Sequence, residues 1–120
     1  SSTTNSGWTN FAASQIIGVA YDADNGKLYF HNNGTYYNSG DPAGGTGAVI
    51  SSISPQYAGV MVPFLGSGTS SARTHEINFG NGYFGTTDIT SAGTNASNLG
   101  RFEYDVPTGY TALCTKGLNE

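Results

Sequence analysis

Side chains that could act as acids, bases or nucleophiles are few and widely spaced in the chain. His31 and His75 are the only histidines and Cys114 is the only cysteine. No serine has the G-x-S-x-G spacing of a nucleophile elbow, and one cysteine excludes an internal disulfide and a multi-cysteine zinc site. We therefore expect both histidines to be packed or edge residues on strands, Cys114 to be a structural thiol, and no residue to be catalytic.

Paired carboxylates are the remaining route to catalysis, because two of them can hydrolyse a glycosidic bond. The candidates are Asp22, Asp24, Asp41, Glu76, Asp88, Glu103 and Asp105. Their expected placement in turns and on solvent-facing strand positions disfavours an active site. Any two could still meet in space, so a glycan hydrolase stays as a third hypothesis.

Two segments resemble ligand-binding motifs without meeting their requirements. Residues 22–26 begin like a calcium loop, but a glycine stands at the fifth position and Asn33 at the twelfth, where ligands are needed. Residues 80–85 spell G-x-G-x-x-G, yet no helical pattern follows to hold a pyrophosphate. We expect a plain turn in the first segment, no dinucleotide site in the second, and neither metal nor cofactor.

Aromatic residues expected to be exposed in or near turns and loops are the best indication of a binding surface: Tyr29, Tyr36, Tyr37, Tyr57, Tyr83 and Phe84. A tyrosine presents an apolar face and a hydroxyl group, which suit contacts with sugars or with protein surfaces. Ordinary sheet packing is the alternative and stays open. The predicted binding residues, in or beside loops at 38–47 and 80–100, are Tyr36, Tyr37, Asp41, Tyr83 and Phe84.

Composition limits the class of protein. The 120 residues suit one domain, 1–120, with a modest core. Only 10% of the residues are charged, the net charge is −4, and four Lys and Arg residues are present. Without a basic patch we expect no nucleic-acid binding, and without an apolar run of about 20 residues we expect no membrane insertion.

Strand patterns recur along the chain, whereas no segment has helical periodicity. Residues 15–21 are apolar on both faces, which predicts a central strand, and 27–31 is its return strand after the turn at Asn25-Gly26. Asn33-Gly34 predicts a second turn into 35–37. Further strands are expected at 49–53, 58–65, 73–79, 102–106 and 110–114, with a long loop at 80–100. Such regular spacing predicts an all-β, antiparallel β-sandwich or barrel.

Three segments resemble parts of SPRY (B30.2-like) domains. Residues 16–47, IIGVAYDADNGKLYFHNNGTYYNSGDPAGGTG, are similar to the family's central hairpin; INFGNGYF (77–84) is similar to a late strand; and FEYDVPTGYTALCTKGLNE (102–120) resembles the closing segment found in bacteriophage structural proteins. The resemblance implies a SPRY/jelly-roll-like sandwich that recognises proteins or peptides without catalysis or cofactors.

This chain departs from the SPRY pattern in two ways. It lacks the family's N-terminal strands, so it corresponds to the C-terminal portion of a domain, and residues 85–101 look like an insertion. Half a sandwich exposes an apolar sheet face, so we expect a longer polypeptide, or completion of the sandwich by a partner chain.

The main hypothesis is therefore a non-catalytic module of a phage virion, in a tail fibre or on the capsid surface, serving assembly or host-surface attachment. Its expected partners are other virion proteins or copies of itself, or a host-surface glycan or protein, and its location is virion or extracellular. The alternative is a carbohydrate-binding module of a secreted or surface protein.

Overall fold

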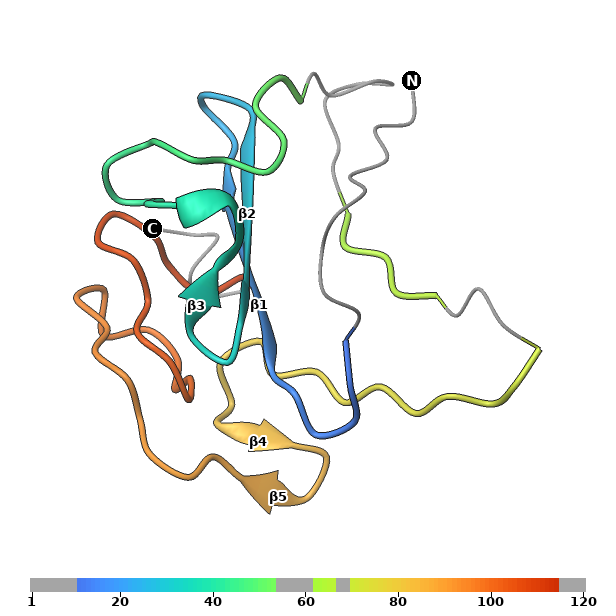
Figure 1. Ribbon diagram of the computed structural model, residues 1–120. Coiled ribbons are helices and arrows are strands. Elements are labelled where there is room, and N and C mark those ends of the chain that lie inside the picture. Colours follow the sequence, from blue (N-terminus) through green and yellow to red (C-terminus); the bar gives the residue numbers. More distant parts are fainter. Residues whose placement is uncertain (1–10, 54–61, 67–69, 115–120) are drawn as a thin grey trace.

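The computed structural model describes residues 11–53, 62–66 and 70–114, and this part of the chain is all-β and antiparallel, as predicted. Strands β1 (Ile17–Asp22), β2 (Lys27–Asn32) and β3 (Thr35–Tyr36) form one sheet; β4 (Tyr83–Phe84) and β5 (Thr87–Asp88) form another. A short 3₁₀ turn, η1 (Tyr37–Ser39), follows β3. The two small sheets give a β-sandwich-like arrangement (Figure 1). Within the described ranges, no helix has the length and apolar character needed to cross a membrane.

The first hairpin matches its sequence pattern closely. β1 and β2 pair from Ile17 opposite Asn32 to Asp22 opposite Lys27. The predicted turn at Asn33-Gly34 joins β2 to β3, and both residues have positive φ, 48° and 89°. A two-residue hairpin loop needs this conformation because it matches the twist of the flanking strands.

The prediction that residues 15–21 form a central strand is wrong. The sheet order is β1-β2-β3, so β2 is central and β1 lies at an edge of the described sheet. Leu28 of β2 also exchanges backbone hydrogen bonds with Val49 and Ile50. Residues 49–53 thus contribute one bridge, at Ile50, in place of the expected strand.

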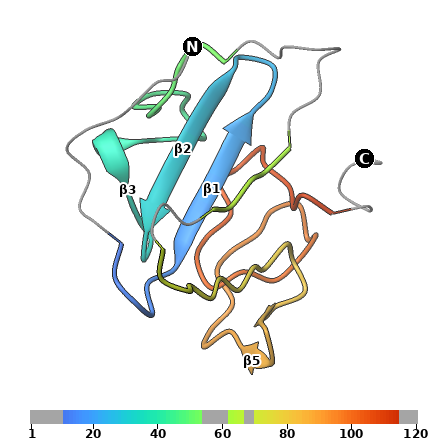
Figure 2. The ribbon, with the colours of Figure 1, turned by 90° about the vertical axis from the view of Figure 1, so that its right-hand side faces the viewer.

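The two faces of the first sheet differ in burial. Ala20, Tyr29 and His31 lie on one face and are buried. The expectation that Tyr29 is exposed is wrong, because its side chain is completely buried on this face. On the other face Val19, opposite Phe30, has 62% of its surface exposed. Figure 2 shows the sheet nearly face-on, and in Figure 1 the orange and red chain of residues 90–114 lies on one side of it. The described core is small, with Ile89, Leu99 and Ala112 as its other buried apolar residues.

Three predicted strands are absent. Residues 73–79, 102–106 and 110–114 form no strand, and residues 73–77 are exposed. Of the predicted strand 58–65, residues 62–65 are exposed and irregular, while 58–61 lie outside the described residues. The predicted loop 80–100 instead contains the β4–β5 hairpin.

In this second region, side chains supplement isolated backbone hydrogen bonds, such as those from Gly93 to Phe102 and from Val106 to Thr94. Asn78 accepts hydrogen bonds from the Gly80 and Gly82 N–H groups and donates to the Arg101 carbonyl. Asn95 donates to the carbonyls of Leu99 and Gly100. Asn and Asp side chains offer the backbone an alternative to sheet pairing, so the alternating apolar pattern here does not produce strands.

Candidate functional site

A cavity of about 270 Å³ lies where the β2–β3 hairpin meets residues 103–105. Its lining comes from two distant parts of the sequence: His31, Gly34, Tyr36, Glu103, Tyr104 and Asp105. We call this cavity the hairpin pocket. It combines three aromatic rings with two carboxylates.

Four residues lie against the His31 ring in the described structure: Gly18, Gly34, Tyr36 and Tyr104. Gly18 lies opposite His31 in the sheet, and a Cβ atom on Gly18 would overlap the ring. The Gly34 N–H donates to His31 Nδ1 at 3.1 Å. Tyr36 and Tyr104 meet the ring edge-to-face, with centroids 5.2 and 5.3 Å away. These contacts make His31 the centre of the aromatic wall.

Burial also determines the charge state of His31. The side chain is only 8% exposed, and this desolvation lowers its pKa below 6.5. The ring is therefore neutral at pH 7. Because Nδ1 accepts a hydrogen bond, the ring proton is on Nε2 in this tautomer.

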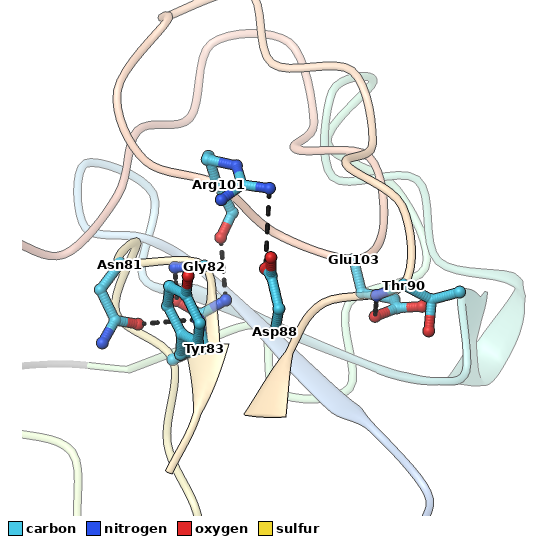
Figure 3. Close-up of polar contacts among 8 residues, drawn as sticks. Asn81, Gly82, Tyr83, Asp88, Thr90, Arg101 and Glu103 are labelled. Atoms are coloured by element: carbon cyan, nitrogen blue, oxygen red, sulfur yellow. Dashed lines mark hydrogen bonds and ion pairs between the residues drawn. The ribbon is translucent and has the colours of Figure 1, made fainter. Parts of the chain in front are cut away.

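Backbone hydrogen bonds hold both carboxylates in place. Glu103 Oε2 accepts from the Thr90 N–H at 2.9 Å (Figure 3), and Asp105 Oδ1 accepts from the Thr94 N–H at 2.7 Å. The bonds from Thr94 lower the pKa of Asp105, while burial and the charge of Asp105 raise that of Tyr36. Both acidic residues thus line the pocket while their carboxylates bond to backbone groups beside it.

Among the residues that the structure describes, no cationic side chain lines the hairpin pocket. Arg101 lies close to Glu103 in sequence, but its guanidinium pairs with Asp88 at 3.7 Å, as Figure 3 shows. The pocket therefore has two acidic groups and a neutral histidine.

A second cavity, of about 420 Å³, is mainly apolar. Ile77, Phe79 and Leu99 contribute to its wall, together with Cys114. Ile77 and Phe79 are about half exposed. This cavity opens the small core of the second region to solvent and has no titratable group besides the thiol.

The structure places one of the five predicted binding residues, Tyr36, in the hairpin pocket. Tyr37 lies in η1, where its ring contacts Phe11 and its hydroxyl accepts a hydrogen bond from Asn32. Asp41 closes a tight loop by pairing with Thr46 and accepting from the Gly44 N–H.

The other two predicted residues are remote from this loop. Tyr83 and Phe84 form β4, and Tyr83 is 40% exposed. In Figure 1 the β4–β5 hairpin and the loop at 38–47 lie at opposite ends of the molecule. The five residues therefore do not form a single site.

Sequence reasoning missed five of the six pocket residues, namely His31, Gly34, Glu103, Tyr104 and Asp105. An expected strand at 102–106 put both carboxylates toward solvent, away from any partner. The available signal was an aromatic residue flanked by two acidic ones, Glu103-Tyr104-Asp105. Nothing in the sequence showed that this triplet meets the turn at Asn33-Gly34.

The other residues considered for catalysis or metal binding form no site within the described part of the chain. His75 is exposed and lines neither cavity. The segment that begins like a calcium loop is a turn, in which Asp22 accepts hydrogen bonds from Asn25. In residues 11–53, 62–66 and 70–114, no three His, Cys, Asp or Glu side chains are placed to hold a metal ion.

Comparison with protein-family models, with curated proteins and with solved structures gave no match to this chain.

Proposed function

We propose that the chain is a non-catalytic recognition and structural module of a bacteriophage virion, placed in a tail fibre or on the capsid surface. Its role is assembly or attachment to the host surface, and the hairpin pocket is its contact site. The virion location is proposed because segments 16–47 and 77–84 resemble SPRY domains, and segment 102–120 resembles the closing segment found in phage structural proteins.

The observation that carries the proposal is the hairpin pocket itself. It joins residues of the first resembling segment, His31, Gly34 and Tyr36, to residues of the last, Glu103 to Asp105. Concave sites with aromatic walls and a few fixed polar groups are typical of ligand recognition. Residues 70 positions apart in the chain thus meet at a surface suited to binding.

The environment of His31 supports a non-catalytic role. A general base needs a free nitrogen within reach of the proton that it removes. His31 Nδ1 is occupied by the Gly34 N–H, and the ring packs against Gly18, Tyr36 and Tyr104. In the described part of the chain, no serine, threonine or cysteine lines the pocket as a nucleophile.

A second candidate, a carbohydrate-binding module of a secreted or surface protein, is favoured by the same lining. Tyrosine rings can stack on the apolar face of a sugar, while carboxylates accept hydrogen bonds from its hydroxyl groups. Tight binding on a glycan array by a protein that is absent from virions would favour this candidate.

Purified phage particles provide the test of the main proposal. Immunogold electron microscopy with an antibody against the chain should label the tail or the capsid surface, and mass spectrometry should find the chain in the particles. Particles that lack the chain contradict the location. A turnover assay on polysaccharides should give no product, and turnover that depends on Glu103 would overturn the non-catalytic assignment.

A further inference from the structure

The described residues that line the hairpin pocket carry a net negative charge. Glu103 and Asp105 both line it, and among the described residues no Lys or Arg does. We propose that the pocket binds the guanidinium group of an arginine side chain presented by a partner protein. This inference deepens the proposed function and depends on it only for the identity of the partner.

None of the cations in the described residues, Lys27, Arg73 and Arg101, lines the pocket. Arg101 is paired with Asp88, and Lys27 donates from Nζ to the Gly45 carbonyl. Lys27 also begins β2, while the pocket lies at the other end of that strand. Two acidic residues beside aromatic rings favour a cationic ligand over a neutral or anionic one.

The aromatic wall favours arginine over lysine. Guanidinium is planar, is weakly hydrated and stacks on aromatic rings, and it can also donate two parallel hydrogen bonds to one carboxylate. The wall holds the Tyr36, His31 and Tyr104 rings, and the neutral His31 adds no repelling charge at pH 7. A compact ammonium group would use the carboxylates but gain less from the rings.

The size and rigidity of the site also fit one side chain. About 270 Å³ lies below the roughly 300–1,000 Å³ of pockets for drug-sized ligands. The Thr90 and Thr94 N–H groups fix the carboxylates before any ligand arrives, so little conformational freedom is lost on binding. This volume and these hydrogen bonds suit the binding of a single side chain.

Amide chemical shifts in two-dimensional NMR test the inference with small probes. N-acetylarginine amide should shift the signals of Gly34, Tyr36 and residues 103–105. N-acetylcitrulline amide has nearly the same shape without the charge and should bind at least tenfold more weakly. Methyl glucoside should cause no shift, and added salt should weaken arginine binding.

Three variants assign the effect to the pocket. Glu103→Gln and Asp105→Asn each remove a charge but keep an oxygen that can accept the Thr90 or Thr94 N–H. Each should weaken arginine binding about threefold, and the double variant about tenfold. Asp24→Asn removes the same charge in the turn at the other end of the hairpin and should leave binding unchanged.

Equal shifts with arginine and citrulline probes, or equal weakening by all three variants, would overturn the inference. So would preferential binding of methyl glucoside, which would instead support the carbohydrate-binding candidate. These outcomes are distinct from a failure of the proposed function. A chain that is present in virions yet indifferent to arginine loses only this inference, whereas a chain that binds arginine but is absent from virions loses the virion assignment.

Discussion

The β1–β2–β3 sheet and the region from residue 78 to residue 106 satisfy their backbone groups in different ways. In the sheet, six consecutive residue pairs join β1 to β2 in one register. In the second region the two-residue strands β4 and β5 are the only ladder described, and side chains such as Asn78 and Asn95 bond to the backbone. A ladder distributes its stabilisation over many equivalent bonds, whereas an asparagine anchor concentrates it in one residue.

The first region should be most sensitive to loss of packing. Tyr29 belongs to β2, and its side chain is completely buried on one face of the sheet. Tyr29→Ala should therefore lower the free energy of unfolding by about 3–5 kcal/mol, as for other large aromatic deletions. Urea unfolding followed by tyrosine fluorescence measures the change. A loss below about 1 kcal/mol would show that Tyr29 does not sit in a packed core.

The second region should be most sensitive to loss of a polar anchor. Asn78→Ala removes the acceptor for two N–H groups and the donor to Arg101. We expect a loss of about 1–3 kcal/mol in unfolding free energy, together with faster amide exchange at Gly80 and Gly82. Ser91→Ala, at an exposed position of the same region, is the control and should change stability by less than about 0.5 kcal/mol.

Acidification should weaken the contact between the two regions through His31. Burial lowers the pKa of His31 in the folded state, so the unfolded chain binds more protons as the pH falls. Stability is therefore complete above about pH 6.5 and declines below it. Asp22 and Asp105, whose pKa values are also lowered, lose their contribution at pH values closer to 4.

Unfolding free energies between about pH 7.5 and pH 5, with an NMR titration of the two histidine rings, check this expectation. The control is His75→Gln, which alters an exposed histidine and should leave the decline intact. If the His31 ring titrates at or above its ordinary pKa, the buried neutral state is wrong.

The smallest effect should come from removing a single hydroxyl group. The Tyr29 hydroxyl is buried and has no hydrogen-bond partner in the described structure. Tyr29→Phe should therefore be neutral or slightly stabilising, within about 1 kcal/mol of the natural chain. A loss of 2 kcal/mol or more, measured beside Tyr29→Ala, would reveal a partner for this hydroxyl.

The same contrast explains how far the sequence predicts the structure. The first hairpin was predictable because its alternating residues and its Asn-Gly turns favour one register, with Asn33 and Gly34 both at positive φ. Residues 73–79 and 102–106 alternate in the same way, yet they form no strands. Their neighbours, Asn78 and the positive-φ glycines 80, 82 and 100, favour local bonds over a ladder.

The candidate site was less predictable than the fold. Tyr36 was named from its position beside a turn, but its partners at 103–105 depend on a contact between segments about 70 residues apart. Neither periodicity nor turn chemistry specifies which irregular segment packs on a given hairpin. The sequence placed Glu103 and Asp105 toward solvent, and Asp105 is indeed exposed while Glu103 is half-buried; what the sequence did not show is that both residues line the pocket and accept hydrogen bonds from the Thr90 and Thr94 N–H groups.

Nuclear Overhauser contacts of the His31 ring give the most direct test of this joining of the two regions. The account predicts cross-peaks from the His31 ring protons to the Gly18 α-protons and to the rings of both Tyr36 and Tyr104. Cross-peaks to Gly18 and Tyr36 with none to Tyr104 would separate residues 103–105 from the hairpin. The pocket, and the recognition role built on it, would then be contradicted.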